Sequence, residues 1–69
     1  MKISARNKIP GTVVEVTKGA TTAHVRIDIG GGNIVTAAIT NEAVEDLGLV
    51  TGGKAIAVVK ASDVLVAVD

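Results

Sequence analysis

Hydroxyl and cationic side chains gather in two short polar stretches of this chain. Ser4 and Arg6 lie in the N-terminal stretch ISARN, and Lys60 and Ser62 lie in the later stretch VVKASDV. A tetrahedral oxyanion needs several hydrogen-bond donors and one or two positive charges, and backbone N–H groups at a bend or a helix N-terminus can add to them. Thr40, at the predicted start of a helix, offers a further hydroxyl. These residue types indicate an oxyanion-binding site, although a lysine that ends a strand is also typical of a solvated edge.

Catalytic and metal-binding residue sets are not recognisable in the sequence. His24 is the one histidine, cysteine is absent, and no serine has an evident base and orienting partner. No cluster has the composition of a structural zinc site, so no side chain is predicted to ligate a metal cation directly. We therefore interpret the chain as a binding protein and not as an enzyme.

Size and composition favour self-association. The chain has 69 residues, of which 48% are hydrophobic, yet none is Phe, Trp or Tyr. Small apolar side chains bury little area each, so a lone core of this length barely offsets chain entropy. Interfaces between copies would enlarge the core, and we expect a homo-oligomer.

Charge and hydropathy narrow the range of partners. Seven basic and seven acidic residues give formal neutrality, which argues against a general nucleic-acid-binding surface. No segment is long and apolar enough to span a bilayer, and the first ten residues lack the hydrophobic run of a signal peptide. The expectation is a cytoplasmic protein with no nucleic-acid or membrane partner.

The elements that must position these residues are mostly strands. Period-two alternation and turn residues predict strands over 11–19, 21–30, 34–40, 55–60 and 63–69. The segment TNEAVEDLGL predicts one short helix over 40–49, with Thr40 or Asn41 as its N-cap and Gly48 as its C-cap. This order predicts an all-β fold, a five-stranded OB-like Greek-key barrel with the helix between strands three and four. Residues 1–10 fall outside the barrel pattern and are predicted to form a polar arm.

The alternation also predicts which side chains face the core. In the second strand, Ala23, Val25, Ile27 and Ile29 share one face. In the first strand, Val14 and Val16 are expected on one face and Val13 on the other. The run GGGN after the second strand predicts a hairpin turn.

The order and spacing of several motifs resemble one known family. ISARN, GTVVEVTKGA, AITNEAVEDLGL and AVVKASDV together are similar to the molbindin, or Mop, family of small cytoplasmic molybdate-binding proteins, over essentially the whole chain. The resemblance implies a single domain over 1–69 that acts alone in molybdenum storage or homeostasis, with molybdate and also tungstate as ligands and no cofactor. It further implies a hexamer, a trimer of dimers, with oxyanion sites at the subunit interfaces.

The resemblance also assigns residues to these sites. The arm over 1–10 would pack on a neighbouring subunit. There its residues would meet residues 60–62 of that neighbour, which form the KAS turn. The implied molybdate-binding residues are Ser4, Ala5, Arg6, Thr40, Lys60, Ala61 and Ser62. A second oxyanion site would use Gly19, Ala20, Thr22 and His24, for which a plain turn and a solvent-facing histidine are an equal interpretation.

Two other functions compete with this interpretation. An OB-type single-strand nucleic-acid binder would need a basic groove and aromatic stacking residues, and the chain has neither. A structural oligomerisation module would use Arg6 and Lys60 only to pair with acidic residues across an interface.

Overall fold

The computed structural model describes residues 1–69 and contains one sheet and one short α-helix. In chain order the elements are β1 (Asn7–Lys18), β2 (Thr22–Gly30), β3 (Asn33–Thr40), α1 (Asn41–Leu47), β4 (Lys54–Val59) and the 3-10 helix η1 (Ala61–Asp63). The sheet is antiparallel throughout, with the strand order β3-β2-β1-β4. The all-β class and the helix between the third and fourth strands are therefore as predicted.

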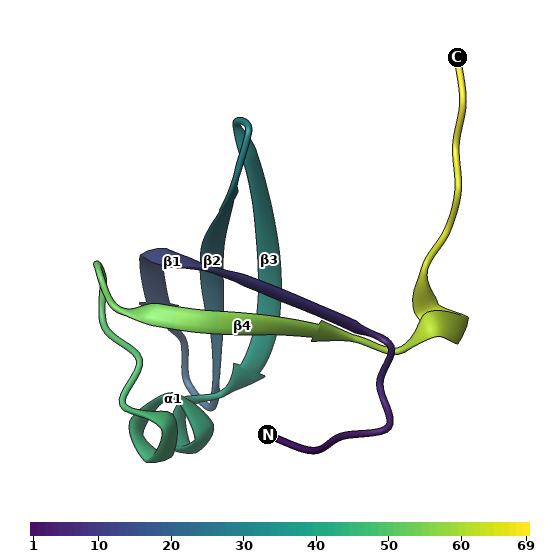
Figure 1. The fold of residues 1–69 in the computed structure, drawn as a ribbon. Helices are drawn as coiled ribbons and strands as arrows, with labels where there is room; N and C mark the ends of the chain where they lie inside the picture. The colour runs from purple at the N-terminus through teal and green to yellow at the C-terminus, as the bar shows by residue number, and fades with distance from the viewer.

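β1 is the long strand that curls the sheet. Its first half pairs with β4, from Asn7 opposite Val59 to Thr12 opposite Lys54, and its second half pairs with β2. Because the partners change along the strand, β4 and the first half of β1 run across the direction of β2 and β3 (Figure 1). This change of partner gives the sheet its barrel-like curl.

A β-bulge in β1 overturns part of the predicted face assignment. The register with β2 shifts between Val13 and Glu15, so Val14 is the extra residue. Val13 is 1% exposed and Val16 is half-buried, whereas Val14 points outward. The prediction that Val14 and Val16 share a face is wrong, because a bulge resets the alternation by one residue.

The core is small. Six of the 69 residues are buried, all of them apolar: Val13, Ala23, Val25, Ile27, Val44 and Ala57. Three of the four residues predicted to share the inner face of β2 are among them, and the fourth, Ile29, is half-buried. The inner face of β2 is thus confirmed.

Turn and cap residues form the connections as predicted. Gly30, Gly31 and Gly32 all have positive φ at the β2–β3 hairpin, a conformation that favours glycine. The hydroxyl oxygen of Thr40 caps α1 by accepting a hydrogen bond from the Ala43 N–H at 3.0 Å. Gly48 ends the helix in the left-handed conformation.

The predicted fifth strand over 63–69 is not a strand in this chain. Asp63 belongs to η1, and residues 64–69 pair with no other segment. The turn at η1 is held by hydrogen bonds from the Asp63 N–H to the Lys60 carbonyl and from the Val64 N–H to the Ala61 carbonyl. The chain therefore leaves the sheet instead of folding back onto it (Figure 1), and the sheet has four strands and no closed Greek-key barrel.

The predicted arm is shorter than expected, because β1 begins at Asn7. Residues 7–10 belong to the sheet, and residues 1–6 lie outside it. Pro10 pairs opposite Ile56 of β4. At this position β1 has no neighbouring strand on its other side, so the absence of an N–H on Pro10 costs no hydrogen bond to such a strand. No helix is long and apolar enough to span a bilayer.

Candidate functional site

The pairing of β1 with β4 brings the two polar stretches to one corner of the sheet. Asn7 and Val59 are the last paired residues at this end, so the segments before Asn7 and after Val59 leave the sheet together (Figure 1). The side-chain amide of Asn7 also donates to the carbonyl oxygen of Val59 at 3.2 Å. A long-range register thus places the arm beside the KAS turn.

A hollow of about 440 Å³ lies between these two segments. It is lined by Ile3, Ser4, Ala5, Arg6, Lys60, Ala61 and Ser62. Six of the seven residues that the resemblance assigned to the molybdate site are in this set. The resemblance implied that they meet across a subunit boundary, whereas in the structure they already meet within one chain.

The hollow carries positive charge and hydrogen-bond donors. The Nε of Arg6 donates to the carbonyl oxygen of Ser4 at 3.0 Å, which folds the arm over on itself and leaves the other guanidinium N–H groups free. Neither Arg6 nor Lys60 has a carboxylate partner, since the one ion pair in the chain joins Lys18 to Glu45. No carboxylate lines the hollow. Two uncompensated cations therefore face one space.

Hydroxyl and backbone groups complete this donor set. Ser4 and Ser62 line the hollow with their hydroxyls, and the N–H groups of Ala61 and Ser62 have no acceptor within the chain. Ala5 and Ala61 can contribute only backbone atoms. Oxyanions are bound in proteins by such mixtures of cations, hydroxyls and free amides.

Thr40 does not lie in this hollow. It ends β3 opposite Thr22 of β2, and its hydroxyl oxygen is used to cap α1. The sequence placed it with Arg6 and Lys60 through the resemblance, but within one chain the fold places it next to the other predicted set. Thr40 could reach the hollow only from another copy.

The second predicted set surrounds the turn between β1 and β2. The Gly19 N–H donates to the Thr22 carbonyl at 2.7 Å and closes the turn, which includes Ala20. His24 lies further along β2 on the exposed face, opposite Thr17 on β1. These residues are exposed, and they line no hollow of their own.

Two asparagines with positioning roles were missed by the sequence reasoning. Asn7 joins β1 to the end of β4. The side-chain amide of Asn41 donates to the Gly19 carbonyl at 2.9 Å and ties α1 to the β1–β2 turn, while its side-chain oxygen is buried with no hydrogen-bond partner. Neither role has a local sequence signal, because each bond joins segments more than 20 residues apart.

Comparison with known proteins agrees with this fold. Residues 3–66 match the TOBE domain family. A probable molybdenum-pterin-binding protein from Haemophilus influenzae is 46% identical over 69 residues, which is the whole of both chains. Molybdenum-pterin-binding protein 2 from Clostridium pasteurianum is 47% identical over 66 residues, which cover 96% of this chain and 97% of the relative.

A solved structure gives the same result in three dimensions. A molybdate-binding protein from Sporomusa ovata superposes with a TM-score of 0.90 at 46% identity, over 97% of this chain and 98% of that one. The fold and the match over residues 3–66 together define a TOBE domain. The chain belongs to the TOBE domain family and, within it, to the molybdenum-pterin-binding (Mop, or molbindin) proteins, which confirms the resemblance found in the sequence.

Proposed function

We propose that this chain binds molybdate in the hollow between the arm and the KAS turn. The observation that carries the proposal is the pair of cations, Arg6 and Lys60, that face one space without a carboxylate partner. The names of the relatives support it, since they are molybdenum-pterin-binding or molybdate-binding proteins.

The donor set suits the chemistry of the ligand. Molybdate near neutral pH is a fully deprotonated dianion, so each of its oxygens accepts hydrogen bonds and none donates. Arg6 offers a planar fork of N–H donors and Lys60 a compact charge, while Ser4 and Ser62 offer hydroxyls. A carboxylate in the hollow would favour a protonated anion such as phosphate, and none is present. Tungstate has the same charge and nearly the same size, and we propose it as a second ligand.

We propose in addition that the chain works as a homo-oligomer, a hexamer built as a trimer of dimers, with residues 1–6 packed on a neighbouring subunit. The polar side chains of the hollow are exposed in a single chain, and only six residues are buried, so a neighbour would both enclose the ligand and enlarge the core. The turn that contains Gly19, Ala20, Thr22 and His24 is proposed as a second oxyanion site in the assembly.

The proposed role is storage or homeostasis of molybdenum in the cytoplasm, without catalysis. A structural neighbour with a TM-score of 0.90 is described as the cytoplasmic molybdate-binding protein ModG, and its structure has molybdate bound. This chain covers 46% of the length of that protein. No set of His, Cys, Asp and Glu in the structure could hold a metal cation, so the proposed ligand is the oxyanion itself.

Isothermal titration with molybdate tests the site. Arg6→Ala and Lys60→Ala each leave one positive charge for a dianion, and removing one partner of a desolvated charge pair costs about 2 kcal/mol or more, which is at least about 30-fold in Kd. Lys8→Ala is the matched control, because it removes an exposed charge near the arm but outside the hollow.

Three outcomes distinguish the candidate functions. Tight binding of molybdate and tungstate but not sulfate, lost in the two hollow variants and kept in Lys8→Ala, supports the proposal. Equal affinity for molybdate in the parent and in all three variants would mean that the ligand binds outside the hollow. A parent protein that assembles but binds no oxyanion is the structural oligomerisation module, in which Arg6 and Lys60 serve assembly only.

A further inference from the structure

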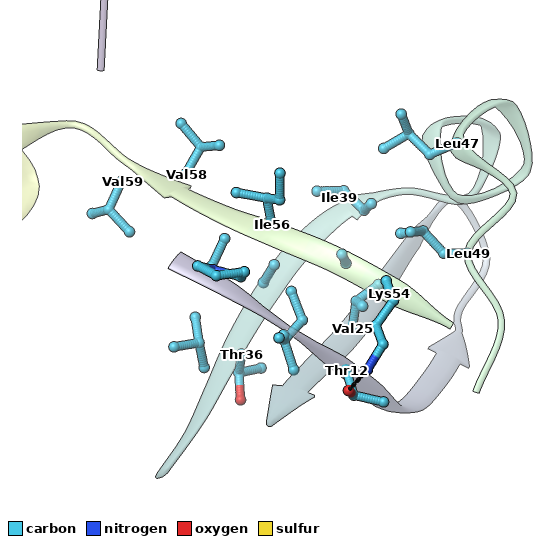
Figure 2. Close-up of a pocket in the computed structure, with 17 residues that line it drawn as sticks. Thr12, Val25, Thr36, Ile39, Leu47, Leu49, Lys54, Ile56, Val58 and Val59 are labelled. Carbon is cyan, nitrogen blue, oxygen red and sulfur yellow. Dashed lines mark hydrogen bonds between the residues drawn. The ribbon is translucent and has the colours of Figure 1, made fainter. Parts of the chain in front are cut away.

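The ladder between β1 and β4 is closed at both ends by a side-chain hydrogen bond. Its end pairs are Asn7 opposite Val59 and Thr12 opposite Lys54. At one end the Nζ of Lys54 donates to the hydroxyl oxygen of Thr12 at 3.2 Å (Figure 2). At the other end the side-chain amide of Asn7 donates to the carbonyl oxygen of Val59, also at 3.2 Å. Of these two bonds, only the one made by Asn7 borders the oxyanion hollow.

Asn7 and Val59 are the direct chain neighbours of the two cations of the hollow. Arg6 precedes Asn7, and Lys60 follows Val59. Beyond this pair no hydrogen bond crosses from the arm to the KAS turn, because the bond made by Arg6 stays within the arm and the bonds of η1 stay within the turn. The spacing of the two cations therefore depends on the last tie before them.

Val59 gives this tie a fixed acceptor. The side chain of Val59 is half-buried and lines an apolar groove of about 1060 Å³ on the open side of the curled sheet (Figure 2). Asn7 is half-buried as well, so its amide is partly shielded from water, and a shielded hydrogen bond is stronger than an exposed one. The bond therefore holds the end of β4 and, with it, the residue that follows.

The residue type at position 7 fits a role beyond strand formation. Asparagine is depleted in strands, where β-branched and aromatic side chains pack better. An amide N–H is, however, the donor that a backbone carbonyl requires, and an ionised aspartate of nearly the same shape supplies none. Asn7→Asp would bring an acceptor against the Val59 carbonyl oxygen and a negative charge next to Arg6.

We infer that Asn7 is a positioning residue of the oxyanion site, whose bond to Val59 holds Arg6 and Lys60 at the spacing that one dianion bridges. Asn7 does not line the hollow, so it acts through its two neighbours. Its effect on affinity rests on the proposed molybdate site, whereas its effect on the spacing of the two segments needs no ligand.

Titration calorimetry with molybdate measures the effect on affinity. Asn7→Ala removes the donor, and we expect it to raise Kd about fivefold to tenfold, which is the effect of one partly buried hydrogen bond. Thr12→Val is the matched control, because it breaks the bond of the same length at the opposite end of the same ladder. We expect similar losses of thermal stability in both variants and a loss of affinity only in Asn7→Ala.

A double-mutant cycle separates positioning from a general loss of structure. A residue that sets the spacing of two cations has little left to position when one of them is removed. Asn7→Ala is therefore expected to change Kd less than twofold in a Lys60→Ala chain. Equal losses of affinity in the two backgrounds overturn the inference, as does an unchanged Kd for Asn7→Ala in the parent.

A measurement without ligand tests the spacing itself. Nitroxide labels are attached at Lys2→Cys and Asp63→Cys, which lie just outside the lining of the hollow in a chain that has no other cysteine. Labelled chains are diluted into unlabelled protein, so that pulsed electron paramagnetic resonance reports the distance within one chain. We expect a narrow distance distribution that Asn7→Ala broadens and Thr12→Val leaves unchanged.

The two measurements keep this inference apart from the proposed function. Equal widths of the distribution in the parent and in both variants overturn the inference, whether or not molybdate binds. A distribution that Asn7→Ala broadens, in a protein that binds no molybdate, supports the role of Asn7 in spacing and overturns the proposed function alone.

Discussion

Gly11 lies where β1 changes its partner from β4 to β2, and the structure gives it almost no free space. It pairs opposite Ala55 of β4, and the next residue, Thr12, pairs with both neighbouring strands. A Cβ added to Gly11 would be 2.5 Å from the carbonyl oxygen of Asp28 and 2.7 Å from Cγ2 of Ile27. The nearer atom is backbone, so it cannot move away by a change of rotamer. Gly11→Ala must therefore push β1 and β2 apart.

The size of the effect follows from two opposing terms. Overpacking a core position costs about 1–3 kcal/mol, and we expect the upper part of this range because backbone is involved. Replacement of glycine by alanine restricts the unfolded chain and returns about 0.4–1 kcal/mol. The net loss in the free energy of unfolding is then about 2 kcal/mol, which for a domain of this size lowers Tm by about 8–16 °C.

Thermal unfolding followed by circular dichroism measures this loss. All samples are compared at one protein concentration, because self-association makes Tm depend on concentration. Gly53→Ala is the matched control: its nearest atoms are Val50 O at 3.1 Å and Val50 Cγ2 at 3.4 Å, so a small shift of the loop accommodates the methyl group. A Tm for Gly11→Ala equal to that of the parent, or equal losses in both variants, would refute the reasoning.

Two further predictions concern the helix cap and the origin of the two cations. Thr40→Ala removes the acceptor of the Ala43 N–H and is expected to lower the free energy of unfolding by about 1 kcal/mol, while Thr40→Ser keeps the cap; equal denaturation midpoints for the two variants would contradict this. Arg6→Ala chains refolded with Lys60→Ala chains are expected not to regain tight molybdate binding in titration calorimetry, because the structure places both cations beside one hollow of one chain; recovery would instead assign them to different subunits.

Local patterns predicted the parts of the fold that depend on neighbouring residues. Alternation identified the buried face of β2, and the types of Thr40 and Gly48 identified the two ends of α1. The bulge at Val14 had no such signal, because Val13 and Val14 are the same residue type and only pairing with β2 decides which one faces inward. Strand propensity likewise predicted an extended segment after Asp63 but not whether a free edge of the same chain lies within reach.

The candidate site likewise has one aspect that the sequence predicted and one that it did not. Its chemistry was predictable, since Arg6, Lys60 and the two serines are the residue types that an oxyanion requires. Their meeting within one chain was not predicted, because it depends on the register of β1 against β4, which joins residues 52 positions apart. The place of Thr40 within the chain was not predicted for the same reason: the pairing of β2 with β3 carries it to the β1–β2 turn, and its part in the oxyanion site stays a prediction.

The hollow and the C-terminal residues 64–69 are joined by one short element, η1. Lys60 precedes it, Ala61 and Ser62 form it together with Asp63, and residues 64–69 follow it directly. In a single chain this turn is held by two hydrogen bonds, and all of its residues are exposed. A neighbouring subunit of the proposed homo-oligomer that packed on this turn would restrict it and reduce the entropy that binding has to overcome. Any such coupling acts equally in both directions, so the ligand would strengthen assembly by the factor by which assembly strengthens binding. The exposure of the KAS turn beside the hollow thus gives a physical reason why oxyanion binding would depend on the proposed assembly.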